Sequence, residues 1–147
     1  TSQLSFHTFD TNSKSAKGCT ALFLAACMGH IRTVELLISV QGIDIKCVDN
    51  DGWTPLMAAS SQGHVQVVEM LLGVVDADHV NARETDTGDG EGNSALTLAV
   101  GSGHLDAIQL LLEVDGINVN ASHWRDGTAL AQASGEGNKD IVKLLLQ

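Results

Sequence analysis

The chain repeats one sequence pattern along its length, and this self-similarity constrains the fold more than any single residue does. In the clearest copy, Thr54-Pro55-Leu56-Met57-Ala58-Ala59 is followed by Gly63-His64 and then by Val68-Glu69-Met70-Leu71-Leu72. The glycine of the pattern recurs along the chain at steps of 34, 40 and 34 residues, as Gly29, Gly63, Gly103 and Gly137. Repeats of this length stack on their neighbours, because one repeat alone cannot bury its apolar face. Such a stack usually offers a binding surface and not a catalytic pocket.

Composition and charge agree with a stacked array and narrow the classes of partner. Aromatic residues make up only 3% of the chain, which suits thin layers of Leu, Val and Ala between neighbouring helices. The formal charge of −10 would repel nucleic acids and anionic membranes, so we expect neither as a partner. No apolar run approaches the roughly 18–20 residues that span a bilayer. The three cysteines, Cys19, Cys27 and Cys47, form no Cys-x-x-Cys pair, which favours a reducing compartment, cytoplasmic or else nuclear.

Each copy of the pattern predicts two helices and an extended loop. Thr54 is a suitable N-cap, and Pro55 suits the first helical position because its missing N–H costs nothing there. The first helix is therefore expected over about 55–62, with Gly63 as a left-handed C-cap. The second helix starts after His64 and carries one apolar face, formed by Val65, Val68, Leu71 and Leu72. The Asn/Asp/Gly-rich stretch that follows each helix pair predicts an extended finger closed by a turn.

These motifs resemble the ankyrin-repeat family. The resemblance rests on Gly-x-Thr-Pro-Leu-x-x-Ala, Gly-His, Val-Glu-x-Leu-Leu and Ile-Asn-Val-Asn-Ala, and it covers about residues 17–147. It implies an all-α solenoid of stacked antiparallel helix pairs with β-hairpin fingers, in repeats over about 17–50, 51–90, 91–124 and 125–147. It also implies a non-catalytic module, without a cofactor, that binds a partner protein through its fingertips and concave inner-helix face. We expect a monomer.

Several segments depart from the repeat. One extra residue precedes Asn81 and about five more lie within 83–91, which makes the third finger longer, acidic and Gly-rich. In the fourth copy Asp126 takes the place of the usual glycine and Gly127 follows one position later, so we expect a reshaped turn. Asn138 replaces the histidine. Residues 1–16 are either a linker or a cap, in which Leu4, Phe6 and Phe9 would cover the first repeat. A solenoid end normally has a polar cap, so we expect either a fragment or a terminal repeat that tolerates exposure.

The candidate metal and catalytic residues are better explained by the repeat. His30, His64 and His104 should lie about 10 Å apart, one per repeat, which is too far for a shared metal ion, so we expect them to bond loop backbone. The cysteines are expected to act as small apolar residues. Asp86, Asp89 and Glu91 suggest calcium, but glycines stand where oxygen ligands belong, which favours a solvated acidic finger. We expect no metal site and no catalytic set.

The partner surface is carried over from the family by position. On the fingers it comprises Asn50, Asp51, Trp53, Glu91, Asn93, Trp124 and Arg125, and at the ends of the inner helices Ser61, Gln62 and Ser102. Each tryptophan either packs on a neighbouring finger or is available to a partner as a hot spot. The third finger carries Glu84, Asp86, Asp89 and Glu91 against Arg83 alone, which suggests a partner with a basic segment and apolar anchors.

Two other functions remain open. The chain could be the regulatory or scaffolding segment of a larger enzyme or channel whose active domain lies elsewhere. Asn81 and Asn120 resemble the asparagines that oxygen-dependent hydroxylases modify in some ankyrin domains, although both could instead hydrogen-bond the finger backbone.

Overall fold

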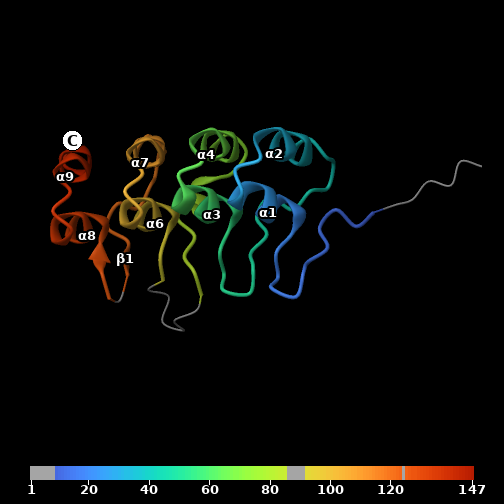
Figure 1. Ribbon diagram of the computed structural model, residues 1–147, viewed down its shortest axis with the longest axis horizontal. Helices are drawn as coiled ribbons and strands as arrows, with labels where there is room; N and C mark the ends of the chain where they lie inside the picture. Colours follow the sequence, from blue (N-terminus) through green and yellow to red (C-terminus); the bar gives the residue numbers. More distant parts are fainter. Residues whose placement is uncertain (1–8, 86–91, 124) are drawn as a thin grey trace, which may run out of the picture.

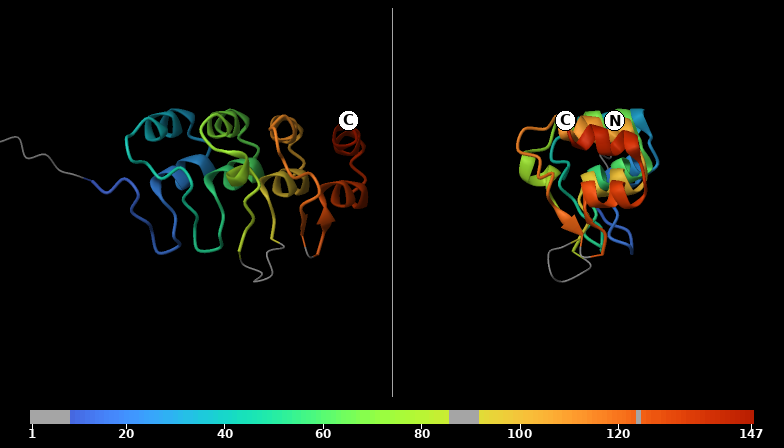
Figure 2. Two further views of the ribbon diagram at one scale, coloured as in Figure 1. Left: turned by 180° about the vertical axis from the view of Figure 1, so that it is seen from behind. Right: turned by 90° about the vertical axis from the view of Figure 1, so that its left-hand side faces the viewer.

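The computed structural model describes residues 9–85, 92–123 and 125–147. In Figure 1 the helices form two layers, and the loops that connect successive repeats extend below the inner layer. The inner helices are α1 (Ala21–Cys27), α3 (Pro55–Gln62), α6 (Ala95–Gly101) and α8 (Ala129–Gly135). The outer helices are α2 (Ile31–Ile38), α4 (Val65–Leu72), α7 (Leu105–Leu112) and α9 (Lys139–Leu145). Figure 2 shows the same row of helix pairs from behind and end-on, and the expected all-α solenoid is confirmed.

Every inner helix begins at a side chain that caps it. The residue before the helix has an extended backbone, and its hydroxyl oxygen accepts from the backbone N–H three residues later at 3.1–3.3 Å. The caps are Thr20, Thr54, Ser94 and Thr128. Each satisfies one of the N–H groups that the first helical turn leaves without a partner. The predicted start of α3 at Thr54 and Pro55, and its end at Gly63, are confirmed.

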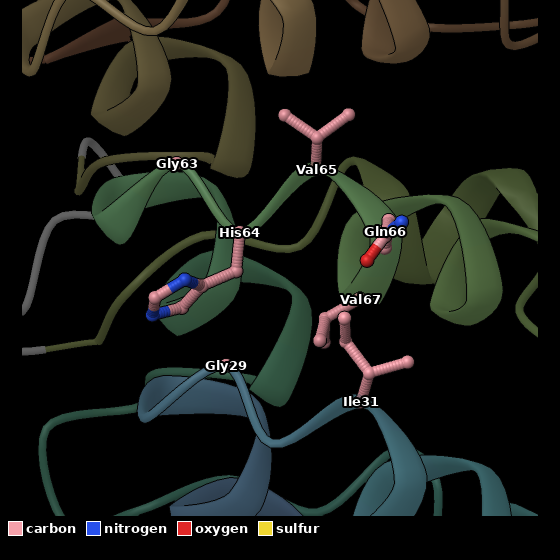
Figure 3. Close-up of a pocket in the computed structure, with 7 residues that line it drawn as sticks. All are labelled: Gly29, Ile31, Gly63, His64, Val65, Gln66 and Val67. Atoms are coloured by element: carbon pink, nitrogen blue, oxygen red, sulfur yellow. The ribbon is translucent and has the colours of Figure 1, made fainter.

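A glycine in the left-handed conformation forms the turn between each inner helix and the outer helix that follows it. The four glycines of the sequence pattern have φ between 71° and 75°, a conformation that is costly for residues with a Cβ. The imidazole of the following repeat lies against this turn: the His64 Nε2 atom is 3.0 Å from the Cys27 carbonyl oxygen, and the His104 Nε2 atom is 3.1 Å from that of Ser61. Figure 3 shows the His64 ring directed toward Gly29. The expected backbone-bonding role is therefore confirmed for these two histidines.

The core lies between the two helix layers and is continuous along the stack. Leu22, Leu56 and Leu96, at the same position of successive inner helices, are at most 1% exposed. The apolar face expected for the outer helices is only partly right. Val68 and Leu71 are buried, but Val65 and Leu72 are only half-buried and Val67 is buried as well. An outer helix packs against both the inner layer and the neighbouring outer helices, so that its buried surface is wider than one stripe.

The fingers are mostly loops, in contrast to the expected hairpins. Within the described residues, only the fourth finger forms a two-stranded hairpin, with β1 (Ser122–His123) antiparallel to β2 (Gly127–Thr128). The third finger contributes one isolated bridge between Arg83 and Ser94. Neighbouring fingers are instead linked sideways by backbone bonds, as from Asn50 N–H to the Lys17 carbonyl oxygen at 3.0 Å.

The longer connection after α4 contains a short helix that the sequence did not lead us to expect. This helix, α5 (Ala77–Val80), begins at Asp76, whose carboxylate accepts from the His79 N–H at 2.8 Å. The Lys46 ammonium donates to Asp76 from the preceding loop, which raises the pKa of Lys46 and lowers the pKa of Asp76. The His79 side chain is buried beside this pair.

The first described residues are bonded to the loop after α2. The Asn12 amide donates to the Gly42 carbonyl oxygen at 2.9 Å, and its own oxygen accepts from the Asp44 N–H at 2.7 Å. Phe9 is 84% exposed, and Leu4 and Phe6 lie outside the described residues. Among the described residues, no helix has the length and apolar character needed to cross a bilayer.

Candidate functional site

The inner helices end in a row of four exposed side chains. Each one immediately precedes a turn glycine, and they come one from each repeat: Met28, Gln62, Ser102 and Glu136, which we call the inner-helix row. Gln62 and Ser102 were expected at the surface from the sequence, whereas Met28 and Glu136 were not. Their equivalence in the repeat could have identified them, because all four occupy one position of the pattern.

Helix α1 gives this row an apolar end. Met28 is 64% exposed, and Leu24, one turn earlier on the same helix face, is 51% exposed. The residue equivalent to Leu24 in the second repeat is Ala58, which is only 2% exposed. The exposure of Leu24 follows from its place in the first helix pair.

Ser61 differs from Gln62 although the two are adjacent. Gln62 is exposed, but Ser61 is half-buried and its carbonyl oxygen faces the His104 Nε2 atom. The backbone of Ser61 therefore belongs to the junction between repeats, and only part of its side chain remains accessible.

The second fingertip exposes Asn50 and Asp51. The Asn50 amide donates to the Ala16 carbonyl oxygen at 2.9 Å, so this side chain fastens the second finger to the first. The Asp51 backbone is held on both sides, by the Asp49 carboxylate and by the Thr85 N–H. Its carboxylate makes no ion pair with any residue that the structure describes. Of the two, Asp51 is the more available to a partner.

Trp53 packs between fingers. Its indole N–H donates to the Glu84 Oε2 atom at 2.8 Å, and the ring is half-buried against the cluster of Phe23, Cys47 and Ala58. Of the two alternatives left open by the sequence, packing on the neighbouring finger is the one observed. Trp124 and Glu91 lie outside the described residues, as do Asp86 and Asp89.

The Glu84 side chain belongs to the third finger and links it to the second. Besides accepting from Trp53, it accepts at Oε1 from both the backbone N–H and the side-chain amide of Asn93, at 3.1 and 2.8 Å. The Glu84 side chain is only 12% exposed. The Asn93 side-chain oxygen in turn accepts from the Thr97 hydroxyl at 3.2 Å. Both residues are therefore internal cross-links of the finger and not free contact points, which corrects the expectation from sequence.

The fourth finger is tied to the third by an arginine. The Arg83 guanidinium donates to the Gly92 carbonyl oxygen at 2.8 Å and to the Ser122 carbonyl oxygen. The turn is reshaped as expected, because the positive φ falls at Gly127 and a hairpin forms. Arg125 is exposed on this hairpin, next to Asp126, whose carboxylate lies 3.2 Å from the His123 Nδ1 atom.

The described residues contain no group of three or more side chains that would hold a metal ion. Cys19, Cys27 and Cys47 are free thiols around Phe23, and burial raises the pKa of Cys47. A shallow cavity of about 260 Å³ between the first two repeats is lined by residues of the turn, among them Gly29, Ile31 and His64 (Figure 3). It lies at a junction that holds the stack together.

Asn81 and Asn120, the two asparagines that resemble hydroxylation sites, differ in their hydrogen bonds. The Asn81 amide donates to the Gly116 carbonyl oxygen at 2.8 Å and its oxygen accepts from the Asn118 N–H at 2.7 Å. This is the backbone-bonding alternative. Asn120 is exposed, and its backbone N–H donates to the Asn118 side-chain oxygen at 3.1 Å.

Comparison with known proteins agrees with this architecture. A family model described as ankyrin repeats (3 copies) matches residues 2–84 and 76–147. The ankyrin repeat and KH domain-containing protein mask of Drosophila melanogaster is 35% identical over 68 residues, 46% of this chain. The ankyrin repeat and SAM domain-containing protein 6 of Mus musculus is 41% identical over 71 residues, 48% of this chain. The matches span only 2% and 8% of these two relatives. With the family model covering nearly its whole length, the chain belongs to the ankyrin-repeat family.

Proposed function

We propose that the chain is a non-catalytic recognition module that binds a partner protein across the inner-helix row and the adjoining fingertips. The observation that carries this proposal is the contrast between two positions of the repeat. The turn glycine is the same in all four copies, whereas the residue before it is Met, Gln, Ser or Glu and is exposed in all four. A scaffold that repeats its packing residues while varying an exposed row supports specific recognition.

The partner would combine an apolar anchor with a basic segment. Leu24 and Met28 offer accessible apolar surface at the α1 end of the row, and Met side chains adapt to varied partners. Glu136, with Asp126 on the nearby finger, places negative charge at the α8 end. In this arrangement Leu24 and Met28 on α1 contact the apolar anchor of the partner, and Trp53 does not, because it is packed between fingers. The net charge of −10 supports a protein partner over a nucleic acid, and the three free thiols support a reducing compartment, cytoplasmic or nuclear.

The test compares two variants with the same change in charge. Gln62→Arg/Ser102→Arg alters the middle of the row, and Gln66→Arg/Gln109→Arg alters exposed positions of the outer helices α4 and α7. Quantitative mass spectrometry after affinity capture should identify a protein retained by the native chain and the outer-helix variant. The row variant should lose it by about tenfold or more, the usual cost of an altered interface centre.

Circular dichroism melting provides the control that both variants fold. Equal retention of the same partner by the two variants would place the contact outside the row. The proposed basic segment of the partner is tested separately, by measuring binding at several ionic strengths. Binding to a basic segment should weaken as ionic strength rises from low to moderate.

A second candidate function is that of a regulatory or scaffolding segment within a larger enzyme or channel. The relatives support only its coarser part, a place within a longer protein, because the matched region occupies 2% and 8% of their lengths. Sequencing of the full-length transcript tests this candidate. A transcript without any enzyme or channel domain would rule it out and leave the recognition module.

A further inference from the structure

A carboxamide at one position of the repeat links neighbouring fingers side by side. The Asn81 amide of the third finger donates to the Gly116 carbonyl oxygen of the fourth at 2.8 Å, and its oxygen accepts from the Asn118 N–H at 2.7 Å. Asn12 bonds two backbone groups of the second finger in the same way. A carboxamide has no charge to gain or lose, so neither of these links depends on pH.

The second and third fingers are linked by ionised groups instead. Lys46 occupies the position of the two asparagines in the second finger, and its ammonium pairs with Asp76, the residue that caps α5. Another link runs from the Trp53 indole N–H to the Glu84 carboxylate at 2.8 Å. Both of these side-chain links end on a carboxylate, and the first one also fixes the start of a helix of only four residues.

His79 lies on α5, beside the pair of Lys46 and Asp76. Its side chain is buried, and its Nε2 atom has no hydrogen-bond partner among the described residues. A protonated imidazole donates from both nitrogens, and a buried charge without acceptors is costly. Opening of α5 to water removes that cost, so a charged His79 favours the open form of this helix.

The charged groups on the segments that contact α5 do not remove this cost. They are Lys46 and Asp44 of the second finger, Asp76 and Asp78 of the α5 segment, and Asp115 of the fourth finger. Burial lowers the pKa of His79, the Lys46 ammonium lowers it further, and the nearby carboxylates oppose this shift without reversing it. The imidazole therefore stays neutral in the closed segment at a pH at which the open segment takes up a proton, below about pH 6.5.

We propose that α5 is an acid-sensitive connection between the second and third fingers, which opens when His79 gains a proton. Opening releases Asp76 from its capping position and so breaks its link with Lys46. The carboxamide link between the first and second fingers stays closed, and helices α3 and α6 stay packed in the continuous core. The connection responds near neutral pH because histidine is the side chain that changes charge there. It acts whichever partner the chain binds.

Hydrogen exchange of single backbone amides, measured by NMR on the whole chain, tests this proposal. The Val80 N–H, bonded to the Asp76 carbonyl oxygen at 3.0 Å, reports the opening of α5. The Asp44 N–H reports the Asn12 link, and the Val68 N–H reports the core of α4. Between about pH 7 and pH 5 the protection factor of Val80 should fall about fivefold or more, whereas that of Asp44 should change by less than about twofold. Val68 should stay better protected than Val80 throughout, because the opening of α5 is local.

Three variants assign the effect to its residues. His79→Leu removes the titrating group, so the protection of α5 should no longer fall in acid. His30→Asn is the matched control, because it removes another histidine and introduces the residue that the fourth repeat carries as Asn138. It should behave like the native chain. Lys46→Asn removes both the link to α5 and a charge that opposes protonation, so Val80 should be less protected at neutral pH and its protection should fall less steeply in acid.

Circular dichroism confirms that each variant folds. The proposal is overturned if Val80 is as protected as Val68 at every pH, since the opening would then be global. It is also overturned if Asp44 loses protection as steeply as Val80, or if His79→Leu keeps the native response to acid. Should His79→Leu fail to fold, Lys46→Asn decides: a response to acid as steep as the native one contradicts the proposal.

Discussion

His79 is buried on α5, at 8% exposure, and its Nε2 atom has no hydrogen-bond partner among the described residues. Burial lowers the pKa of His79 below its ordinary value of 6.5, and the Lys46 charge adds to this effect. The nearby carboxylates of Asp76 and Asp44 act in the opposite direction but do not reverse it. At this residue, folding therefore favours the neutral imidazole.

Part of the stability of the protein should consequently depend on pH through His79. Below about pH 6.5 the unfolded chain takes up a proton that the folded chain does not, so the free energy of unfolding falls as pH decreases from 7 toward 5. Above pH 7 this contribution is fully present. Urea unfolding at a series of pH values should show the decline in the native chain and a flatter profile in His79→Leu. A His79→Leu profile as steep as the native one would contradict this assignment.

The hydrogen bond between Trp53 and Glu84 could not be predicted from either residue alone. The repeat pattern placed Trp53 on a finger and allowed either packing or exposure. Its partner lies 31 positions later, in a finger whose length departs from the repeat. Since a hydrogen bond to a charged group is worth about 1.5–3 kcal/mol, the packed alternative is favoured once the two fingers are adjacent. Only their adjacency in space could decide it.

At the scale of helices and turns, local signals were sufficient for the helix α3 and its turn. Thr54, Pro55 and Gly63 act within a few residues of their position, so their roles as cap, first helical residue and left-handed turn followed from sequence. Helix α5 was missed because its cap, Asp76, follows a glycine and two valines and is held by Lys46 from the preceding loop. Its cap is therefore also in contact with the preceding repeat.

The turn glycines allow backbone strain to be separated from contact between repeats. Gly63→Ala and Gly103→Ala impose the same left-handed strain, about 1–2 kcal/mol each. The new Cβ at position 63 would also meet the His104 ring at 2.5 Å, whereas that at position 103 meets no atom within 4 Å. We expect Gly63→Ala to reduce the free energy of unfolding by roughly 1–3 kcal/mol more than Gly103→Ala, as measured by urea denaturation.

A His104→Ala background serves as the control for that comparison. Once the ring is removed, the two glycine substitutions should have similar costs. If the difference between them persisted, the contact between the ring and the turn would not be its cause.

For the whole molecule, the position of a repeat in the stack determines how much an equivalent residue contributes to the free energy of unfolding. Leu56 and Leu130 occupy the same place in α3 and α8, but they are 1% and 38% exposed. Leu56→Ala should cost about 2–5 kcal/mol, the usual range for a buried leucine. Leu130→Ala should cost at least ~1 kcal/mol less, because part of that side chain is already in water. Denaturation at low protein concentration measures both, and equal costs would mean that the end repeat is packed as tightly as the interior.

By itself, the sequence determined the family, the two-helix repeat, the caps and turns, and the backbone role of the histidines. These features follow from contacts that recur in successive copies, so the period reveals them, although only His64 and His104 make the histidine contact. Only the tertiary structure decided which members of a repeated set remain exposed. Met28 and Glu136 are exposed beside Gln62 and Ser102, and Leu24 is exposed as well. Trp53 and Glu84 instead link two fingers, and Asn93 bonds Glu84 within the third finger. The physical reason is that exposure depends on the neighbouring repeat, and a sequence pattern describes one repeat at a time.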